Sequence, residues 1–262
     1  MKIITLIENS AISDSFSSEH GLSLYIETKE CKILFDAGQT DAFAINAEKL
    51  GIDLTAVDFA VLSHGHYDHS GGLQRFLQIN QKAPIYLSKY ASNPYYHGSE
   101  RYIGIDPNLL NCERLILTGE THIINENMAL YSCNENTAPF PIDSAGLTVL
   151  QNGQYVDDLF LHEQYLLIEE KSKKVLISGC SHKGILNIAE WFKPDILIGG
   201  FHFMNIDPSA EAHKLNKAAN QLLTYPTTYY TGHCTGTEQF SYMKSIMGNK
   251  LHSISSGSEI II

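Results

Sequence analysis

Residues 60–72 read AVLSHGHYDHSGG, in which a short apolar segment runs directly into three histidines and one aspartate. The polar side chains are His64, His66, Asp68 and His69. Imidazole nitrogen and carboxylate oxygen are donors that zinc and similar divalent ions favour. Gly65 permits a tight bend between the first two histidines. The stretch therefore predicts a strand that ends at a metal site with enough donors for two adjacent ions.

Short β-rich runs recur along the chain, and helical periodicity separates the later ones. Strands are expected at 3–7, 22–27, 32–35, 59–63, 85–87, 115–117, 128–132, 165–169, 175–178, 196–199, 228–231 and 260–262. Helices are expected at 41–50, 72–80, 184–192, 210–223 and 238–247. Two sheets packed face to face, with helices outside, would bury these apolar strands on both sides. We therefore expect a single α/β domain over residues 1–262, a four-layer αββα sandwich.

The stretch from Lys89 to Asn111 interrupts this rhythm with tyrosines interleaved with proline and glycine. We expect a Tyr-rich insertion loop near 89–111, which is either a functional lid or an irregular surface excursion. Three of its side chains are candidates for contact with a substrate: His97, Arg101 and Tyr102.

Composition limits the functional classes. The formal net charge of −11 argues against a general nucleic-acid binder, which needs clustered Lys and Arg. No apolar run is long enough to span a bilayer, and the N-terminus shows no signal-peptide core. The five cysteines have no paired spacing and are expected to be reduced thiols. A cytoplasmic protein with a small-molecule substrate and no membrane or nucleic-acid partner is expected, while its oligomeric state is left open.

The segment 64–69 resembles the His-x-His-x-Asp-His signature of the metallo-β-lactamase superfamily, and further elements in the family's order extend the resemblance over nearly the whole chain. Residues 34–38, LFDAG, resemble the family's first motif. There Asp36 would orient a metal-bound histidine without touching the metal, and such support fixes the tautomer and ring direction. The resemblance implies the four-layer sandwich fold and a metal-dependent enzyme.

The resemblance also implies the metal ligands. His64 and His66 would hold the first ion, and Asp68 and His69 the second. His162 and His233 match the family's later histidine ligands in order and context. Two divalent ions are implied, with zinc favoured over iron or manganese.

Cys180 stands where the family places a bridging aspartate, and a thiolate bridges two ions less readily than a carboxylate. His182 lies two residues further and would point to the same side if the chain stayed extended. Position favours Cys180 as the inner ligand and chemistry favours His182, so both remain candidates. His202 follows another apolar run beside two glycines and is expected to act as a proton donor or substrate contact.

Residues 179–185, with Gly199–His202 and Gly232–Gly236, resemble a branch named for dihydropterin-ribofuranosylaminobenzene-phosphate synthase, which joins a pterin methyl diphosphate to an arylamine. Three functions are considered. The first is a hydrolase acting with metal-activated water on an ester, lactone or phosphate-type substrate. The second is a pterin/arylamine-condensing transferase that releases pyrophosphate, with an anionic or pterin-like substrate. The third is an iron-dependent redox protein or a non-catalytic binding protein on the same fold.

In the hydrolase hypothesis three residues have catalytic roles. Asp68 would orient water or shuttle its proton, and His202 or His182 would protonate the leaving group.

Overall fold

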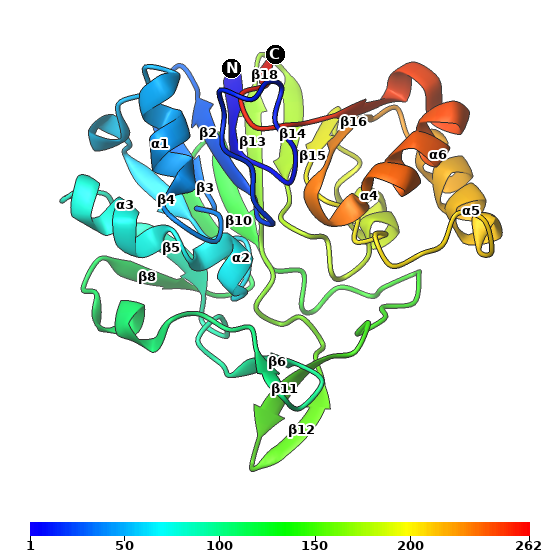
Figure 1. Ribbon diagram of the computed structural model, residues 1–262, viewed down its shortest axis with the longest axis horizontal. Coiled ribbons are helices and arrows are strands. Elements are labelled where there is room, and N and C mark those ends of the chain that lie inside the picture. The colour runs from blue at the N-terminus through cyan, green and yellow to red at the C-terminus, as the bar shows by residue number, and fades with distance from the viewer.

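Two seven-stranded β-sheets stand face to face in the computed structural model, which describes residues 1–262 (Figure 1). The first sheet is parallel over its second half, from the third strand of the chain onward. In spatial order its strands are β18 (Glu259–Ile261), β1 (Lys2–Ile7), β2 (Ser23–Glu27), β3 (Lys32–Phe35), β4 (Phe59–Val61), β5 (Ile85–Ser88) and β8 (Leu115–Thr118).

The second sheet has an antiparallel half and a parallel half. In spatial order its strands are β17 (Leu251–Ser253), β16 (Thr228–Thr231), β15 (Ile196–Ile198), β14 (Lys173–Ile177), β13 (Tyr165–Glu170), β10 (Met128–Tyr131) and β9 (Thr121–Asn125). The four strands β14 to β17 run parallel to one another, so their carboxyl ends lie along one edge of the sheet.

Helices cover the outer face of each sheet, as Figure 1 shows. Phe43 and Phe76 pack the first two long helices on one sheet, while Ile188 and Leu215 pack later helices on the other. A separate apolar layer, including Phe35 and residues of the facing strands, fills the space between the sheets. The α-helices are α1 (Ala42–Lys49), α2 (Tyr67–Ser70), α3 (Leu73–Ile79), α4 (Ile185–Phe192), α5 (Ala212–Leu223) and α6 (Thr237–Met247), and the 3-10 helices are η1 (Leu54–Ala56), η2 (Pro107–Asn111), η3 (His233–Thr235) and η4 (Gly248–Lys250).

The four-layer αββα order expected from the sequence is confirmed. Every expected strand and long helix is present, with ends shifted by a few residues. The sequence patterns missed β9, β17, the short helix α2 and a third sheet. The missed elements are short, and the pairing of a short strand depends on partners far away in the chain.

The segment expected as one long loop, residues 89–111, contains two strands that join a third, four-stranded sheet. Its strands, in spatial order, are β12 (Gln154–Asp157), β11 (Leu147–Gln151), β6 (Tyr95–His97) and β7 (Arg101–Tyr102). This sheet projects from the sandwich at the bottom of Figure 1. Tyr95, Leu147 and Phe160 form its small apolar core, with Tyr67 from the metal motif packed against it. The sheet therefore forms a wall beside residues 64–69.

Candidate metal centre

The histidines and aspartate that the sequence singled out converge where several parallel strands end. The motif at 64–69 follows β4, and the short helix α2 holds Asp68 and His69. On the facing sheet, Cys180 follows β14, His202 follows β15 and His233 follows β16. Because the carboxyl ends of parallel strands share one edge, residues far apart in the chain meet there.

His64, His66 and His182 form a three-histidine cluster. Their ligand atoms lie within 4.8 Å of one another, and all three side chains are buried. His182 Nε2 lies 3.3 Å from His64 Nε2, and the buried His66 Nε2 has no hydrogen-bond partner. Burial, reinforced by the neighbouring histidines, holds the pKa of each ring well below its usual value of 6.5. At neutral pH these are uncharged imidazoles with lone pairs to offer.

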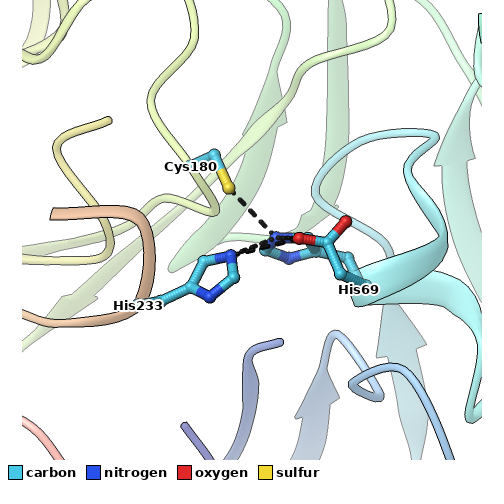
Figure 2. Close-up of side chains that lie close together, drawn as sticks. His69, Cys180 and His233 are labelled. Carbon is cyan, nitrogen blue, oxygen red and sulfur yellow. Dashed lines mark hydrogen bonds and ion pairs between the residues drawn. The ribbon is translucent and has the colours of Figure 1, made fainter. Parts of the chain in front are cut away.

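Asp68, His69, Cys180 and His233 form a second group, here called the mixed cluster (Figure 2). His69 Nε2 lies 3.1 Å from Cys180 Sγ and 3.2 Å from His233 Nε2. Asp68 Oδ2 lies 3.3 Å from His233 Nε2. Burial alone would raise the pKa of Asp68, but the surrounding histidines, His69 first, hold it well below its usual value. The carboxylate is therefore ionised.

Asp36 orients two of the histidine rings through hydrogen bonds. Its Oδ2 accepts a hydrogen bond from His69 Nδ1 at 2.6 Å and another from Ser63 Oγ at 2.7 Å. Because the single hydroxyl proton of Ser63 is used on Asp36, His64 Nδ1–H donates to Ser63 Oγ, 2.8 Å away. Both rings thus carry their proton on Nδ1 and present the Nε2 lone pair. His233 is set in the same way, since its Nδ1–H donates to Asn9 Oδ1 at 2.8 Å.

The chain separates the two candidates for the inner ligand, Cys180 and His182. Ser181 between them adopts a left-handed backbone with φ of 60°, so the segment is not extended. The buried Glu163 carboxylate accepts the backbone N–H of His182 at 2.7 Å and that of Lys183 at 3.0 Å, which fixes this turn. Cys180 consequently lies in the mixed cluster and His182 in the three-histidine cluster. The sequence had left these residues as alternatives for one place, on the premise of an extended segment.

His162 is buried beside the three-histidine cluster. One potential ligand atom of its ring lies within 4.8 Å of a potential ligand atom of His66 and of one of Asp158. However, both ring nitrogens are used. Gly65 N–H donates to Nδ1 at 2.8 Å, which places the ring proton on Nε2, and this proton is donated to Asp158 Oδ2 at 3.0 Å. A nitrogen that carries a proton has no lone pair for a metal. The geometry therefore gives His162 a role in holding the Gly65 bend, unlike the ligand role implied by the family resemblance.

The residues present fit divalent ions. In the mixed cluster, His69 Nε2 and His233 Nε2 face one another while each Nδ1 is bound to an oxygen acceptor, an arrangement that a cation between the two Nε2 atoms would stabilise. Burial alone would lower the pKa of His69, but Asp36 and Asp68 outweigh it and raise the pKa, so the cluster attracts positive charge. Imidazole, thiolate and carboxylate together are a donor set suited to zinc.

Both clusters border one cavity of about 130 Å³. His97 and Arg101 of the small sheet line it, as expected for substrate contacts, and so does His202. Tyr102 does not line it: its hydroxyl donates to the Ile105 carbonyl at 2.7 Å. The predicted contact between Tyr102 and substrate therefore has no support in this geometry.

His20 also lines the cavity, although nothing in its local sequence indicated a role. Its Nε2 lies 3.4 Å from Asp68 Oδ2, and its ring lies 4.7 Å from that of His233, centroid to centroid. His20 precedes β2 in an irregular segment, so only the tertiary packing of that segment against the site reveals it.

This geometry agrees with a family comparison. Residues 19–214 match the model of the metallo-beta-lactamase superfamily. The chain belongs to this superfamily. Metallo-beta-lactamase proteins typically bind divalent metals, and the match spans every motif residue up to His202 and includes both Cys180 and His182. No helix of the chain has the length and apolar character needed to cross a membrane.

Three relatives illustrate the chain's place among metallo-beta-lactamase proteins. The crystal structure of Tm1679, described as a metal-dependent hydrolase of the beta-lactamase superfamily, is 34% identical, with a TM-score of 0.80 and coverage of 100% of this chain and 99% of that one. Two proteins of Methanocaldococcus jannaschii are each 29% identical. The first, the uncharacterized protein MJ0448, is matched over 92% of this chain and 93% of its own. The second, 7,8-dihydropterin-6-methyl-4-(beta-D-ribofuranosyl)-aminobenzene-5'-phosphate synthase, is matched over 90% and 88%.

Proposed function

We propose that this protein is a metal-dependent hydrolase that acts on an ester, lactone or phosphate-type centre of a small molecule. The observation that carries the proposal is the pair of buried ligand clusters beside one cavity, each with its donor atoms within 4.8 Å of one another. The 34% identity to a protein described as a metal-dependent hydrolase also supports it.

His64, His66 and His182 would hold one divalent ion, and Asp68, His69, Cys180 and His233 a second, with zinc as the expected metal. Divalent ions, when bound, polarise a carbonyl or phosphoryl oxygen and make water more acidic. Asp36 and Ser63 keep the Nε2 lone pairs of His69 and His64 available for this purpose.

Two side chains at the cavity are placed to form hydrogen bonds to a water molecule and to the leaving group. The Asp68 carboxylate is ionised, and its Oδ2 lies 3.4 Å from His20 Nε2. As a hydrogen-bond acceptor, this carboxylate would bind and orient a water molecule. Burial, together with the nearby His233, lowers the pKa of His202 to about 4. At neutral pH His202 would therefore be an uncharged hydrogen-bond donor to the leaving-group oxygen. His182, in contact with His64, would be a ligand and not the acid.

The substrate would be small and carry negative charge at its outer end. Arg101 supplies the cavity with a permanent positive charge, and its Nη2 donates to Tyr67 Oη at 2.5 Å. The whole chain has a net charge of −11, so this local cation favours a small anion over a nucleic acid. The five free cysteines support a reducing, cytoplasmic location.

Substitution of the motif tests the proposal. His66→Ala and Asp68→Ala should abolish turnover of generic phosphodiester and lactone substrates, while circular dichroism shows an unchanged fold. His213→Ala removes an exposed histidine on α5 and should leave turnover unchanged. Full activity in both site variants, or the absence of any stoichiometric metal in the purified protein, would overturn the proposal.

The 29% identity to the named synthase favours a second candidate, condensation of a pterin methyl diphosphate with an arylamine phosphate. In that reaction the amine nitrogen bonds to the pterin methylene carbon, and the carbon–oxygen bond to the diphosphate breaks with release of pyrophosphate. Supplying both substrates and measuring pyrophosphate decides between transferase and hydrolase. Elemental analysis addresses the iron-dependent redox alternative, which requires iron in place of zinc.

A further inference from the structure

A second cavity, of about 610 Å³, lies further along the carboxyl edge of the second sheet than the cavity that borders the two ligand clusters. His233 follows β16, and the next strand in the sheet, β17, ends at Ser253. The second cavity is bounded by the end of β17, by residues 8–10 after β1 and by the start of α6. It is here called the β17 groove, and the cavity of about 130 Å³ beside the clusters is called the reaction cavity.

The two cavities share part of their walls. His233 and Met204 line both of them, so the groove begins where the reaction cavity ends. Asn9 of the groove accepts a hydrogen bond from His233 Nδ1 at 2.8 Å, and its Nδ2 lies 3.3 Å from Nδ1 of His20, which lines the reaction cavity. Gln239 Nε2 donates to the Met204 carbonyl at 3.1 Å and fixes this boundary. A molecule that reacts at the clusters can therefore extend past Met204 into the groove.

The lining of the β17 groove is polar but has no cationic side chain of Lys or Arg. Only three of its sixteen residues are hydrophobic. The carboxylate of Glu8 is already bound, because it accepts the backbone N–H groups of Ser10 and His233. Glu238 is exposed in the first turn of α6, where its charge offsets the positive end of the helix. Two carboxylates without a cation disfavour an anion and favour a neutral group.

Hydroxyl groups supply most of the remaining hydrogen-bonding capacity. Ser10 Oγ donates to Glu8 Oε2 at 2.6 Å, so Ser255 Oγ, 2.9 Å away, donates to Ser10 Oγ. Ser255 Oγ is thereby left as an acceptor for a ligand hydroxyl. Thr237 and Ser253 add exposed hydroxyls to the lining. Together with the Glu238 carboxylate, they match a group that carries several hydroxyls, since a carboxylate readily accepts the hydroxyls of a sugar.

We propose that the β17 groove is a second substrate-binding subsite, which takes a neutral polyhydroxylated group, such as a sugar ring, joined to the reacting ester or phosphate-type centre. The Phe240 ring in the lining offers an apolar surface to the C–H face of such a ring. The proposal rests on the proposed hydrolase function and narrows its substrate class. Arg101 does not line the groove, and Figure 1 shows its small sheet and α6 on different sides of the molecule. Recognition of the anionic part and of the hydroxylated part can therefore be separated by substitution.

A pair of matched substrates tests this proposal on the purified protein as isolated. Both are 4-nitrophenyl phosphodiesters, one of methyl ribofuranoside through its 5-oxygen and the other of 1-pentanol. In both, water attacks phosphorus and 4-nitrophenolate leaves, so only the second alcohol differs. We expect kcat/KM to be about 10-fold higher for the ribosyl substrate, which is the effect of one or two hydrogen bonds. Equal kcat/KM values for the two substrates overturn the subsite and leave the hydrolase proposal standing.

Two variants and a matched control locate the preference. Ser253→Phe fills the groove and should bring the ratio of the two kcat/KM values close to 1. Glu238→Ala removes one acceptor and should lower the ratio about 3-fold. Glu48→Ala is the control, because it removes an exposed helical carboxylate from α1, outside the groove, and should keep the ratio. A ratio that stays at its original value in both groove variants overturns the proposal.

Binding of the sugar alone separates the subsite from the chemistry. Methyl ribofuranoside contains no ester or phosphate, so saturation-transfer NMR measures its contact with the protein without turnover. We expect a signal that is lost in Ser253→Phe and kept in Glu48→Ala. If neither phosphodiester is turned over but this pattern is seen, the hydrolase proposal fails for phosphodiesters and the subsite is supported. Absence of saturation transfer in the unmodified protein overturns the subsite.

Discussion

The carboxylate of Asp36 accepts a hydrogen bond from His69 Nδ1 at 2.6 Å, deep in the sandwich where both side chains are fully buried. The same oxygen accepts the Ser63 hydroxyl, which in turn accepts from His64 Nδ1. One carboxylate therefore fixes the tautomer of a ligand in each cluster. Asp36 itself has a left-handed backbone, with φ of 57°, which turns its side chain toward the motif at the end of β3.

We expect Asp36→Asn to weaken metal binding at both clusters by roughly 10- to 100-fold, because an amide accepts less strongly and no longer fixes the histidine protons. Ser63→Ala should weaken binding at the three-histidine cluster alone, since the bond from His69 to Asp36 remains. Chelator competition on each purified variant measures both effects. Equal losses at the two clusters in Ser63→Ala would contradict this network.

We expect His162→Asn to keep both metal equivalents, whereas His182→Asn should lose one. The asparagine amide oxygen can still accept the Gly65 N–H, which preserves the bend of the motif. The stacking of His162 on Tyr95, at 3.9 Å between centroids, is lost, so a lower melting temperature is expected. Elemental analysis checks the predicted metal content, and calorimetry checks the predicted fall in melting temperature. Loss of one metal ion from His162→Asn would restore His162 to the ligand set.

We expect the metal-free protein to lose stability as the pH falls below about 6.5. His64, His66 and His182 have folded-state pKa values well below 6.5, so the unfolded chain binds protons that the folded chain does not. Stability is therefore fully present above the unfolded pKa and is lost as the pH falls toward the folded values. Each such histidine costs about 1 kcal/mol of unfolding free energy at a pH one unit below 6.5.

Urea denaturation at pH 7.5 and pH 5.5 measures this loss. The raised pKa of His69 acts in the opposite sense, because Asp36 and Asp68 favour its protonated form in the folded protein. Replacing His66 with Gln should reduce the pH dependence, as one of the groups that bind a proton only on unfolding is removed. An unchanged unfolding free energy between the two pH values would show that these histidines are not neutral in the folded protein.

We expect Arg101→Gln to raise KM for an anionic substrate about 10-fold, with little change in kcat, because Arg101 lies at the cavity wall and belongs to neither ligand cluster. A neutral lactone should show no change. Tyr67→Phe, which removes only the partner of the Arg101 hydrogen bond, should have a smaller effect. Steady-state kinetics on paired charged and neutral substrates would reveal the difference, and equal KM increases for both would argue against recognition of an anion.

The sequence by itself determined the sandwich and the motif. The run of apolar residues before His64 and the crowding of donors at 64–69 depend on local order alone, so they can be read along the chain. The alternation of strand and helix in the second half likewise predicted the strands that precede Cys180, His202 and His233, while their parallel pairing came from the structure.

Only the tertiary structure decided which metal-ligand candidates belong to which of the two clusters. Cys180 and His182 differ by two positions, and the left-handed turn at Ser181, fixed by Glu163 from the segment just before β13, sends them to different clusters. The proton on His162 depends on an amide 97 residues away in the chain, and His20 reaches Asp68 only through packing. Hydrogen bonds between distant residues set tautomers and ring directions, and no local pattern of residue types records them.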